Sequence, residues 1–141
     1  EMAQMKLLDG SGYRKLREVI EMQGGNPQVL ERFELLPMAT GAREVITPRS
    51  GWVTAIDAED IALAAGMIGA SPDNPRGQID PAVGVVLEVK VGQRVEAGSV
   101  LCRLYYTEED QVAEAAQAVE DAFKISSQRA EGRELILEVV G

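Results

Sequence analysis

Histidine is absent from this 141-residue chain, and cysteine occurs only once, at Cys102. Without histidine the chain cannot form a Ser-His-Asp triad, a Cys-His pair or a histidine-ligated metal centre. A single cysteine also excludes an intramolecular disulfide, because that bond joins two cysteine side chains. The hydrolases, zinc modules and disulfide scaffolds that depend on these groups are therefore ruled out for the chain itself.

Cationic and aromatic side chains are also scarce. The chain carries 14 lysines and arginines against 23 aspartates and glutamates, which gives a formal net charge of -9. A field of this sign repels phosphate backbones and anionic membranes, so neither nucleic acid nor a membrane is an expected partner. Aromatic residues make up 4% of the chain and hydrophobic residues 45%, so aliphatic side chains must supply the core.

Long apolar runs are missing as well. No segment approaches the roughly 18 consecutive apolar residues of a membrane helix, and residues 1–12 have no apolar stretch typical of a secretory signal. We therefore expect a soluble, cytoplasmic protein. The chain begins at Glu1 instead of methionine, which is consistent with a piece of a longer polypeptide.

Residues 1–40 differ in pattern from the rest of the chain. Apolar residues at helical spacing after Ser11, a candidate N-cap, predict a helix to about Gln23, and Gly24-Gly25 indicates where it ends. A short turn and an aperiodic linker follow. We place the boundary near residue 40, with residues 41–141 as the main domain.

The main domain alternates short β patterns with two helical stripes. One helix is predicted from Ala58 to about Ile68 with Asp57 as its cap, and another from about Glu108 to Phe123 with Thr107 as its cap. Segregated helices among short, hairpin-like strands predict an α+β fold instead of a doubly wound parallel sheet. The predicted strands cover residues 45–47, 52–56, 83–91, 94–95, 100–106, 124–126 and 135–140.

The pattern P-x-x-G followed by an apolar residue and valine occurs twice, at Pro48–Val53 and at Pro81–Val86. Two copies are fewer than the three repeats that a solenoid needs, so we interpret them as two related corners of one sheet. The glycines in both copies, Gly51 and Gly84, indicate bends or close backbone approach.

Acidic residues and the cysteine are the first candidates for chemistry. Asp57, Glu59 and Asp60 could form a metal site or an acid-base pair, but capping and the helix dipole already explain carboxylates in a first helical turn. Cys102 lies on the apolar face of a predicted strand with no histidine to activate it, so we interpret it as a buried small hydrophobe.

Other candidate sites also fit poorly. The proline-rich stretch 69–81 does not have the ligand spacing of a calcium loop, and Gly24-Gly25 and Gly66–Gly69 do not occupy the strand-to-helix turn of a phosphate loop. Sequence reasoning therefore assigns no catalytic, cofactor-binding or metal-binding residue to this chain, and it implies no cofactor.

The run G-x-x-V-x-x-G-x-x-L at Gly92–Leu101 resembles the second half of biotinyl and lipoyl carrier domains. A carrier needs its modified lysine at a hairpin tip just after such a strand, whereas Lys90 precedes the run and the next lysine is Lys124. The run therefore indicates a relative of the barrel-sandwich hybrid fold without the attachment residue. A stand-alone binding or carrier-like module is the alternative hypothesis.

Three longer segments resemble the C-terminal part of thymidine and pyrimidine-nucleoside phosphorylases, in register from about Gly10 to Ala122. The string S-G-W-V-T-A-I-D-A-E is the most specific part of this resemblance. The loop 71–77 departs from the family's usual glycine-arginine segment, and residues 102–106 stand where relatives often carry a histidine. The matching segments are Tyr13–Pro27, Pro48–Ala65 and Ile79–Gly98.

This resemblance implies a C-terminal α+β domain of the α/β-hammerhead type, with residues 1–40 left from the preceding α/β domain. The parent enzyme would convert a pyrimidine nucleoside and phosphate to free base and (deoxy)ribose 1-phosphate, as a homodimer. Its upstream α and α/β domains would bind the base and the phosphate, and no position of this chain matches those residues. A related phosphorylase that acts on nucleoside monophosphates is an alternative parent.

Overall fold

The computed structural model describes residues 2–74, 77–129 and 138. The chain separates into an N-terminal unit, residues 1–37, and a C-terminal unit, residues 38–141. The N-terminal unit contains two helices and two 3-10 turns: α1 (Met2–Leu8), α2 (Ser11–Met22), η1 (Pro27–Leu30) and η2 (Phe33–Leu35). In the described part of the chain, no helix is long and apolar enough to cross a membrane.

The end of α2 confirms the glycine stop signal. Gly24 takes a left-handed conformation with φ 78°, which costs glycine little because it has no Cβ. Its N–H donates to the Glu21 carbonyl at 3.0 Å, and the Gly25 N–H donates to the Ile20 carbonyl at 2.8 Å. These two bonds satisfy carbonyls that the helix end would otherwise leave without partners.

The start of α2 differs from the prediction. Ser11 is the first helical residue and not the N-cap, a position held by Gly10 with φ 70° and no side-chain bond. The Ser11 N–H instead donates to the Asp9 carboxylate at 2.7 Å. The side chain that accepts a backbone N–H at this helix start is therefore Asp9, and not Ser11 as the sequence predicted.

The apolar residues of α2 are only partly covered within the N-terminal unit. No residue of α1 or α2 is buried, and Leu16 and Val19 are 49% and 39% exposed. A helix whose apolar residues share one face is stabilised mainly by packing that face against another element. The N-terminal unit therefore leaves part of the apolar face of α2 exposed.

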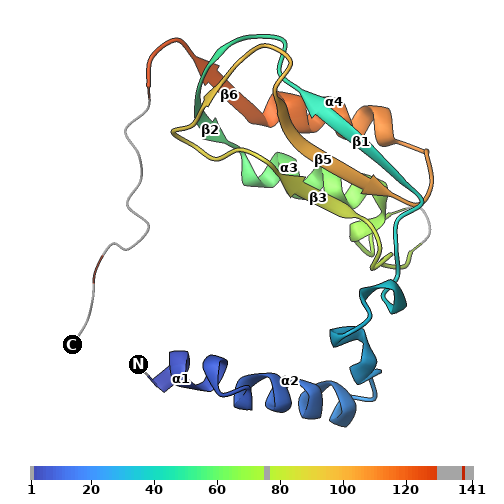
Figure 1. The fold of residues 1–141 in the computed structure, drawn as a ribbon. Coiled ribbons are helices and arrows are strands. Elements are labelled where there is room, and N and C mark those ends of the chain that lie inside the picture. The colour runs from blue at the N-terminus through green and yellow to red at the C-terminus, as the bar shows by residue number, and fades with distance from the viewer. Residues whose placement is uncertain (1, 75–76, 130–137, 139–141) are drawn as a thin grey trace. The chain divides into compact units, whose positions relative to one another are not determined.

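The C-terminal unit has two antiparallel, three-stranded sheets and a pair of helices (Figure 1), which confirms the α+β prediction. The first sheet has the strand order β1-β5-β3, and the second has the order β4-β2-β6. The strands are β1 (Gly41–Ile46), β2 (Gly51–Ile56), β3 (Gly84–Leu87), β4 (Arg94–Val95), β5 (Val100–Tyr106) and β6 (Phe123–Ser126). The helical elements are α3 (Ala58–Ala65), a π-helical turn η3 (Gly66–Ala70), and α4 (Val112–Ala122).

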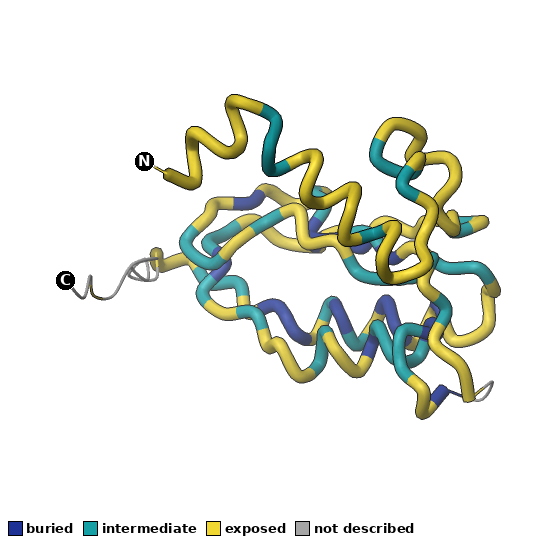
Figure 2. Tube along the Cα trace, turned by 90° about the horizontal axis from the view of Figure 1, so that it is seen from below, coloured by how far each residue is buried: buried dark blue, intermediate teal, exposed yellow. Residues whose placement is uncertain are grey.

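One aliphatic core joins the two helices to both sheets. Its buried residues lie mainly on α4 and on the strands, with Ala64 on α3 and Ile68 on η3. The buried positions of the chain are dark blue in Figure 2. Phe123 is the one aromatic residue among the buried core residues that the structure describes. The core comprises Val45, Val53, Ala64, Ile68, Val95, Leu101, Cys102, Leu104, Val112, Ala115, Ala116, Val119 and Phe123.

A β-bulge in β5 changes which residues face the core. Val45 pairs with Cys102 and the next residue, Ile46, pairs with Val100, so Leu101 has no partner across β1. The extra residue interrupts the two-residue alternation of the strand. Leu101 and Cys102 are consequently both buried, although strict alternation placed them on opposite faces.

The helix after β5 begins later than predicted. It starts at Val112 with Gln111 as its N-cap in a left-handed conformation, φ 62°. Thr107 does not cap it, because the Thr107 hydroxyl donates to the Asp80 carboxylate at 2.7 Å.

The other helix, α3, ends at Ala65 and continues as η3. Apart from Glu138, which is exposed and belongs to no helix or strand, the residues of the strand predicted at 135–140 lie outside the described residues.

The two copies of the P-x-x-G pattern begin strands in different sheets. Gly51 opens β2 and Gly84 opens β3, so the interpretation as corners of one sheet was wrong. The glycines also differ in their surroundings. A Cβ added at Gly51 would lie 2.6 Å from the Ser126 carbonyl oxygen, whereas one added at Gly84 would meet nothing within 4 Å.

Replacing these two glycines by alanine should therefore have unequal effects. We expect Gly51→Ala to lower the free energy of unfolding by about 1–3 kcal/mol, because β2 and β6 must separate to accommodate the methyl group. Gly84→Ala should change it by less than about 0.5 kcal/mol. Urea denaturation of both variants measures the difference, and equal losses would contradict the close approach at Gly51.

Candidate functional site

The acidic cluster at Asp57 is a helix cap. The Asp57 carboxylate accepts the N–H groups of Glu59 at 2.9 Å and Asp60 at 3.4 Å, while its own N–H donates to the Ala122 carbonyl at 3.0 Å. This is the capping role that the sequence favoured. Among the residues that the structure describes, no three or more acidic or cysteine side chains are grouped so as to hold a metal ion.

The loop that follows η3 is organised by Asn74, which is only 8% exposed. Its side-chain amide donates to the carbonyl of Gln78 at 2.7 Å and also to the carbonyl of Ser71. Buried amides of this kind satisfy backbone groups that no regular element reaches. Sequence reasoning did not identify Asn74, because its neighbour Pro75 indicates only a generic loop.

Asp80 ties the other end of this loop to the first sheet. Its N–H donates to the Gly69 carbonyl at 2.9 Å, and its two carboxylate oxygens accept the Ala82 N–H at 2.9 Å and the Thr107 hydroxyl at 2.7 Å. Both oxygens are thus engaged within the protein. The Asp80 carboxylate therefore links this loop to Thr107, which directly follows β5.

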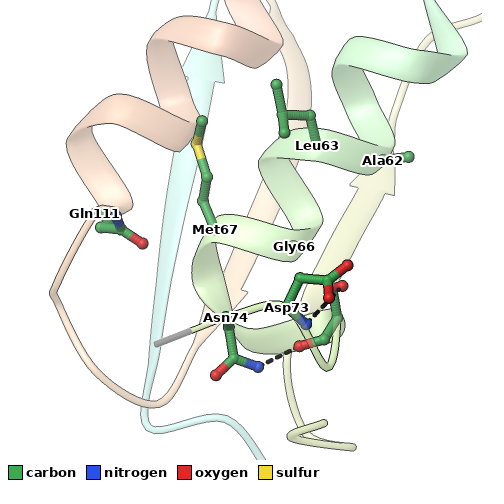
Figure 3. A pocket seen from close by; sticks show the side chains of 8 residues that line it. Ala62, Leu63, Gly66, Met67, Asp73, Asn74 and Gln111 are labelled. Atoms are coloured by element: carbon green, nitrogen blue, oxygen red, sulfur yellow. Dashed lines mark hydrogen bonds between the residues drawn. The ribbon is translucent and has the colours of Figure 1, made fainter. Parts of the chain in front are cut away.

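A pocket of about 370 Å³ lies beside this loop (Figure 3). Its apolar side is formed by α3 and η3, where Leu63 and Met67 project into it, and its polar side carries Asp73. No lysine or arginine is among the described residues that line it. The lining residues are Ala62, Leu63, Gly66, Met67, Ser71, Asp73, Asn74 and Gln111.

Arg103 is the cation at the centre of the first sheet. Its guanidinium contacts Glu44 on β1 at 3.1 Å and forms a second ion pair with Glu88, just beyond β3. The hydrogen bond to Glu44, and then the charge of Glu88, raise the pKa of Arg103 above its ordinary value. This arginine is therefore held by two carboxylates, in a position where it joins three strands.

The glycine run shared with carrier domains forms turns, as predicted. Gly92 and Gly98 have φ values of 90° and 87° on either side of β4. Lys90 lies in the turn before β4, and its N–H donates to the Gln93 side chain at 2.6 Å. Lys124 lies in β6, where its ammonium donates to the Asp121 carbonyl at 2.9 Å.

Cys102 is fully buried in β5, at 0% exposure, which confirms its interpretation as a small core residue. Burial, with a smaller contribution from the charge of Glu88, raises the pKa of the Cys102 thiol to about 11. Since the thiolate is the nucleophile, this environment suppresses reaction at neutral pH.

We expect the Cys102 thiol to resist alkylation. Iodoacetamide at pH 8 should modify the folded chain at least about 100-fold more slowly than the chain in 8 M urea, because only unfolding exposes and ionises the thiol. Mass spectrometry follows the reaction. Equal rates in the two conditions would show that the thiol is accessible in the folded protein.

The raised pKa also gives a stability difference with a definite sign. The folded state holds the thiol proton to about pH 11, whereas an unperturbed thiol ionises near 9. The stabilisation is therefore complete below pH 9 and is lost as the pH rises toward 11. Relative to Cys102→Ala, the chain should lose on the order of 2 kcal/mol of unfolding free energy across this window, measured by urea denaturation.

Comparison with known proteins identifies the domain. The model of the family described as the pyrimidine nucleoside phosphorylase C-terminal domain matches residues 52–126. The pyrimidine-nucleoside phosphorylase of Staphylococcus aureus strain USA300 is 36% identical over 101 residues, which cover 72% of this chain and 23% of the relative. That of Staphylococcus haemolyticus strain JCSC1435 is 33% identical over 120 residues, which cover 85% of this chain and 28% of the relative.

The chain thus spans about a quarter of the length of these curated relatives. The family match runs from β2 to β6 and so includes both helices and five of the six strands described above. On this evidence the chain belongs to the family of pyrimidine nucleoside phosphorylase C-terminal domains.

Proposed function

We propose that this domain is the C-terminal part of an enzyme that converts a pyrimidine nucleoside and phosphate to the free base and (deoxy)ribose 1-phosphate. The observation that carries this proposal is the family match over residues 52–126, together with relatives that bear the name of this activity. The parent enzyme would be a cytoplasmic homodimer.

The chemistry of this reaction supports an active site in upstream domains. Phosphorolysis needs donors that hold the phosphate and stabilise charge on the departing base. In the part of the chain that the structure describes, the pocket beside η3 presents Asp73, and Arg103 is held between two carboxylates. These features favour a structural role for this domain. It would support the phosphate-binding domain and move with it when the active-site cleft between the domains of the parent enzyme closes.

Two surfaces with exposed apolar residues are suited to contact with such upstream domains. The first is the partly exposed apolar face of α2, which includes Leu16 and Val19. The second is the outer face of the first sheet, where Val86 lies opposite Arg103 and Tyr105 lies two residues further along β5. Val86 is 48% exposed and Tyr105 is 36% exposed. Exposed apolar patches of this kind are typical of surfaces that meet another domain.

The size of the native polypeptide is the first test. An immunoblot of source extract, with an antibody raised against this chain, should show a band several times heavier than the chain itself. A band at the mass of the 141 residues alone would favour a stand-alone binding module and would contradict the proposal.

Activity assays form the second test. The purified 141-residue chain should release no uracil or thymine from a nucleoside and phosphate, whereas the longer polypeptide should do so. Deleting residues 41–141 from that polypeptide should reduce turnover at least about 100-fold, because the cleft would lose its support. Phosphate-dependent release by the isolated chain would show that its active site had been overlooked.

A further inference from the structure

The pocket of about 370 Å³ beside η3, which we call the η3 pocket, has no part in the proposed function. Its volume lies at the small end of the range that ligand pockets span. Its apolar wall comes from one continuous stretch of α3 and η3, from which Leu63 and Met67 project into it (Figure 3). Because Leu63 is 57% exposed, a ligand along this wall would remove apolar surface from water.

The polar side of the η3 pocket carries a single charge. Asp73 is the one charged residue among the described residues that line the pocket. Its N–H donates to the Ser71 hydroxyl at 3.2 Å. Its carboxylate has no hydrogen-bond or ion-pair partner in the part of the chain that the structure describes. This carboxylate is therefore available to a ligand of opposite charge.

The loop that carries Asp73 is held in place by its neighbour Asn74. The Asn74 side chain is buried and donates to the Gln78 carbonyl at 2.7 Å, and the Asn74 N–H donates to the Ser71 carbonyl at 3.3 Å. These bonds form without any ligand. A ligand that binds here does not have to order the loop first, which lowers the entropic cost of binding.

Gln111 lines the η3 pocket from the start of α4. With φ 62°, it is the one non-glycine residue of positive φ in the described part of the chain. Strained residues of this kind gather at ligand sites, where the surrounding structure maintains them. Glu109, Asp110 and Glu114 surround Gln111 in the sequence, so acidic side chains meet the positive end of the α4 dipole.

We propose that the η3 pocket binds a small molecule that carries a primary ammonium group on an aliphatic chain. The aliphatic chain lies along Leu63 and Met67, and the ammonium group pairs with the Asp73 carboxylate. An apolar wall beside a carboxylate is complementary to such an amphipathic cation. The net charge of -9 adds a long-range attraction for cations. This inference does not rest on the proposed function.

Titration of the 141-residue chain with hexylammonium chloride tests the proposal. In protein labelled with ¹³C in its methionine methyl groups, the Met67 signal reports on the pocket and the signal of Met38, which is 71% exposed, is the control. We expect a saturable shift of Met67 alone, with half-saturation at roughly 10 mM or below. Hexanoate has the same length and the opposite charge, so it should give no saturable shift.

Substitutions separate the contribution of charge from that of shape. Asp73→Asn should weaken hexylammonium binding at least about fivefold, because it removes the charge and keeps the shape of the side chain. Asp121→Asn is the matched control and should stay within about twofold, because Asp121 lies roughly 15 Å further along α4 than Gln111. An unchanged signal from Trp52, the single tryptophan, shows that each variant is folded.

The length of the aliphatic chain tests the apolar wall. Propylammonium should bind at least about fivefold more weakly than hexylammonium, because it has three fewer methylene groups to place along Leu63 and Met67. Equal affinities would show that the wall makes no contact with the ligand, and the proposal would be wrong.

Three further results would overturn the proposal. Equal Met67 shifts with hexylammonium and hexanoate would show an apolar hollow that does not select charge. Unchanged affinity in Asp73→Asn would show that this carboxylate is not the partner of the ammonium group. Loss of the Met67 shift in a longer native polypeptide would assign the pocket to contact with another domain.

Discussion

The burial of β5 is the constraint on which the C-terminal unit depends. This strand pairs with β1 on one side and β3 on the other, and Leu101, Cys102 and Leu104 fill the space beneath the helices. With few aromatic side chains available, the core consists almost entirely of aliphatic residues and alanines, which pack densely only when the elements approach closely. The bulge at Leu101 adds one more side chain to that core without lengthening the sheet.

Local signals in the sequence predicted most of the elements correctly. Gly24-Gly25 ends α2, Asp57 caps α3, and the short strand at residues 124–126 is β6. Each of these signals acts within a few residues along the chain, so its physical cause is contained in the sequence pattern itself. The same reasoning explains why the α+β class could be predicted before any tertiary contact was known.

Several of the errors concern contacts that exist only once the chain has folded. Thr107 has the local pattern of a helix cap, but its hydroxyl finds Asp80, which is 27 residues away. The two P-x-x-G strings look alike, yet an added Cβ would meet the neighbouring strand only at Gly51. Asn74 was missed because the carbonyls that it satisfies converge only after the loop has closed. Sequence periodicity carries no information about such partners, and the functional assignment accordingly rests on family membership instead of on a local motif.

The hydrogen bond from the Asp57 N–H to the Ala122 carbonyl has an electrostatic consequence. It brings the first turn of α3 beside the last turn of α4, two helices that also contact each other along their lengths. The partial positive charge of one macrodipole therefore lies next to the partial negative charge of the other. Because neither charge belongs to a titratable side chain, this attraction persists across the whole pH range in which the helices stay folded.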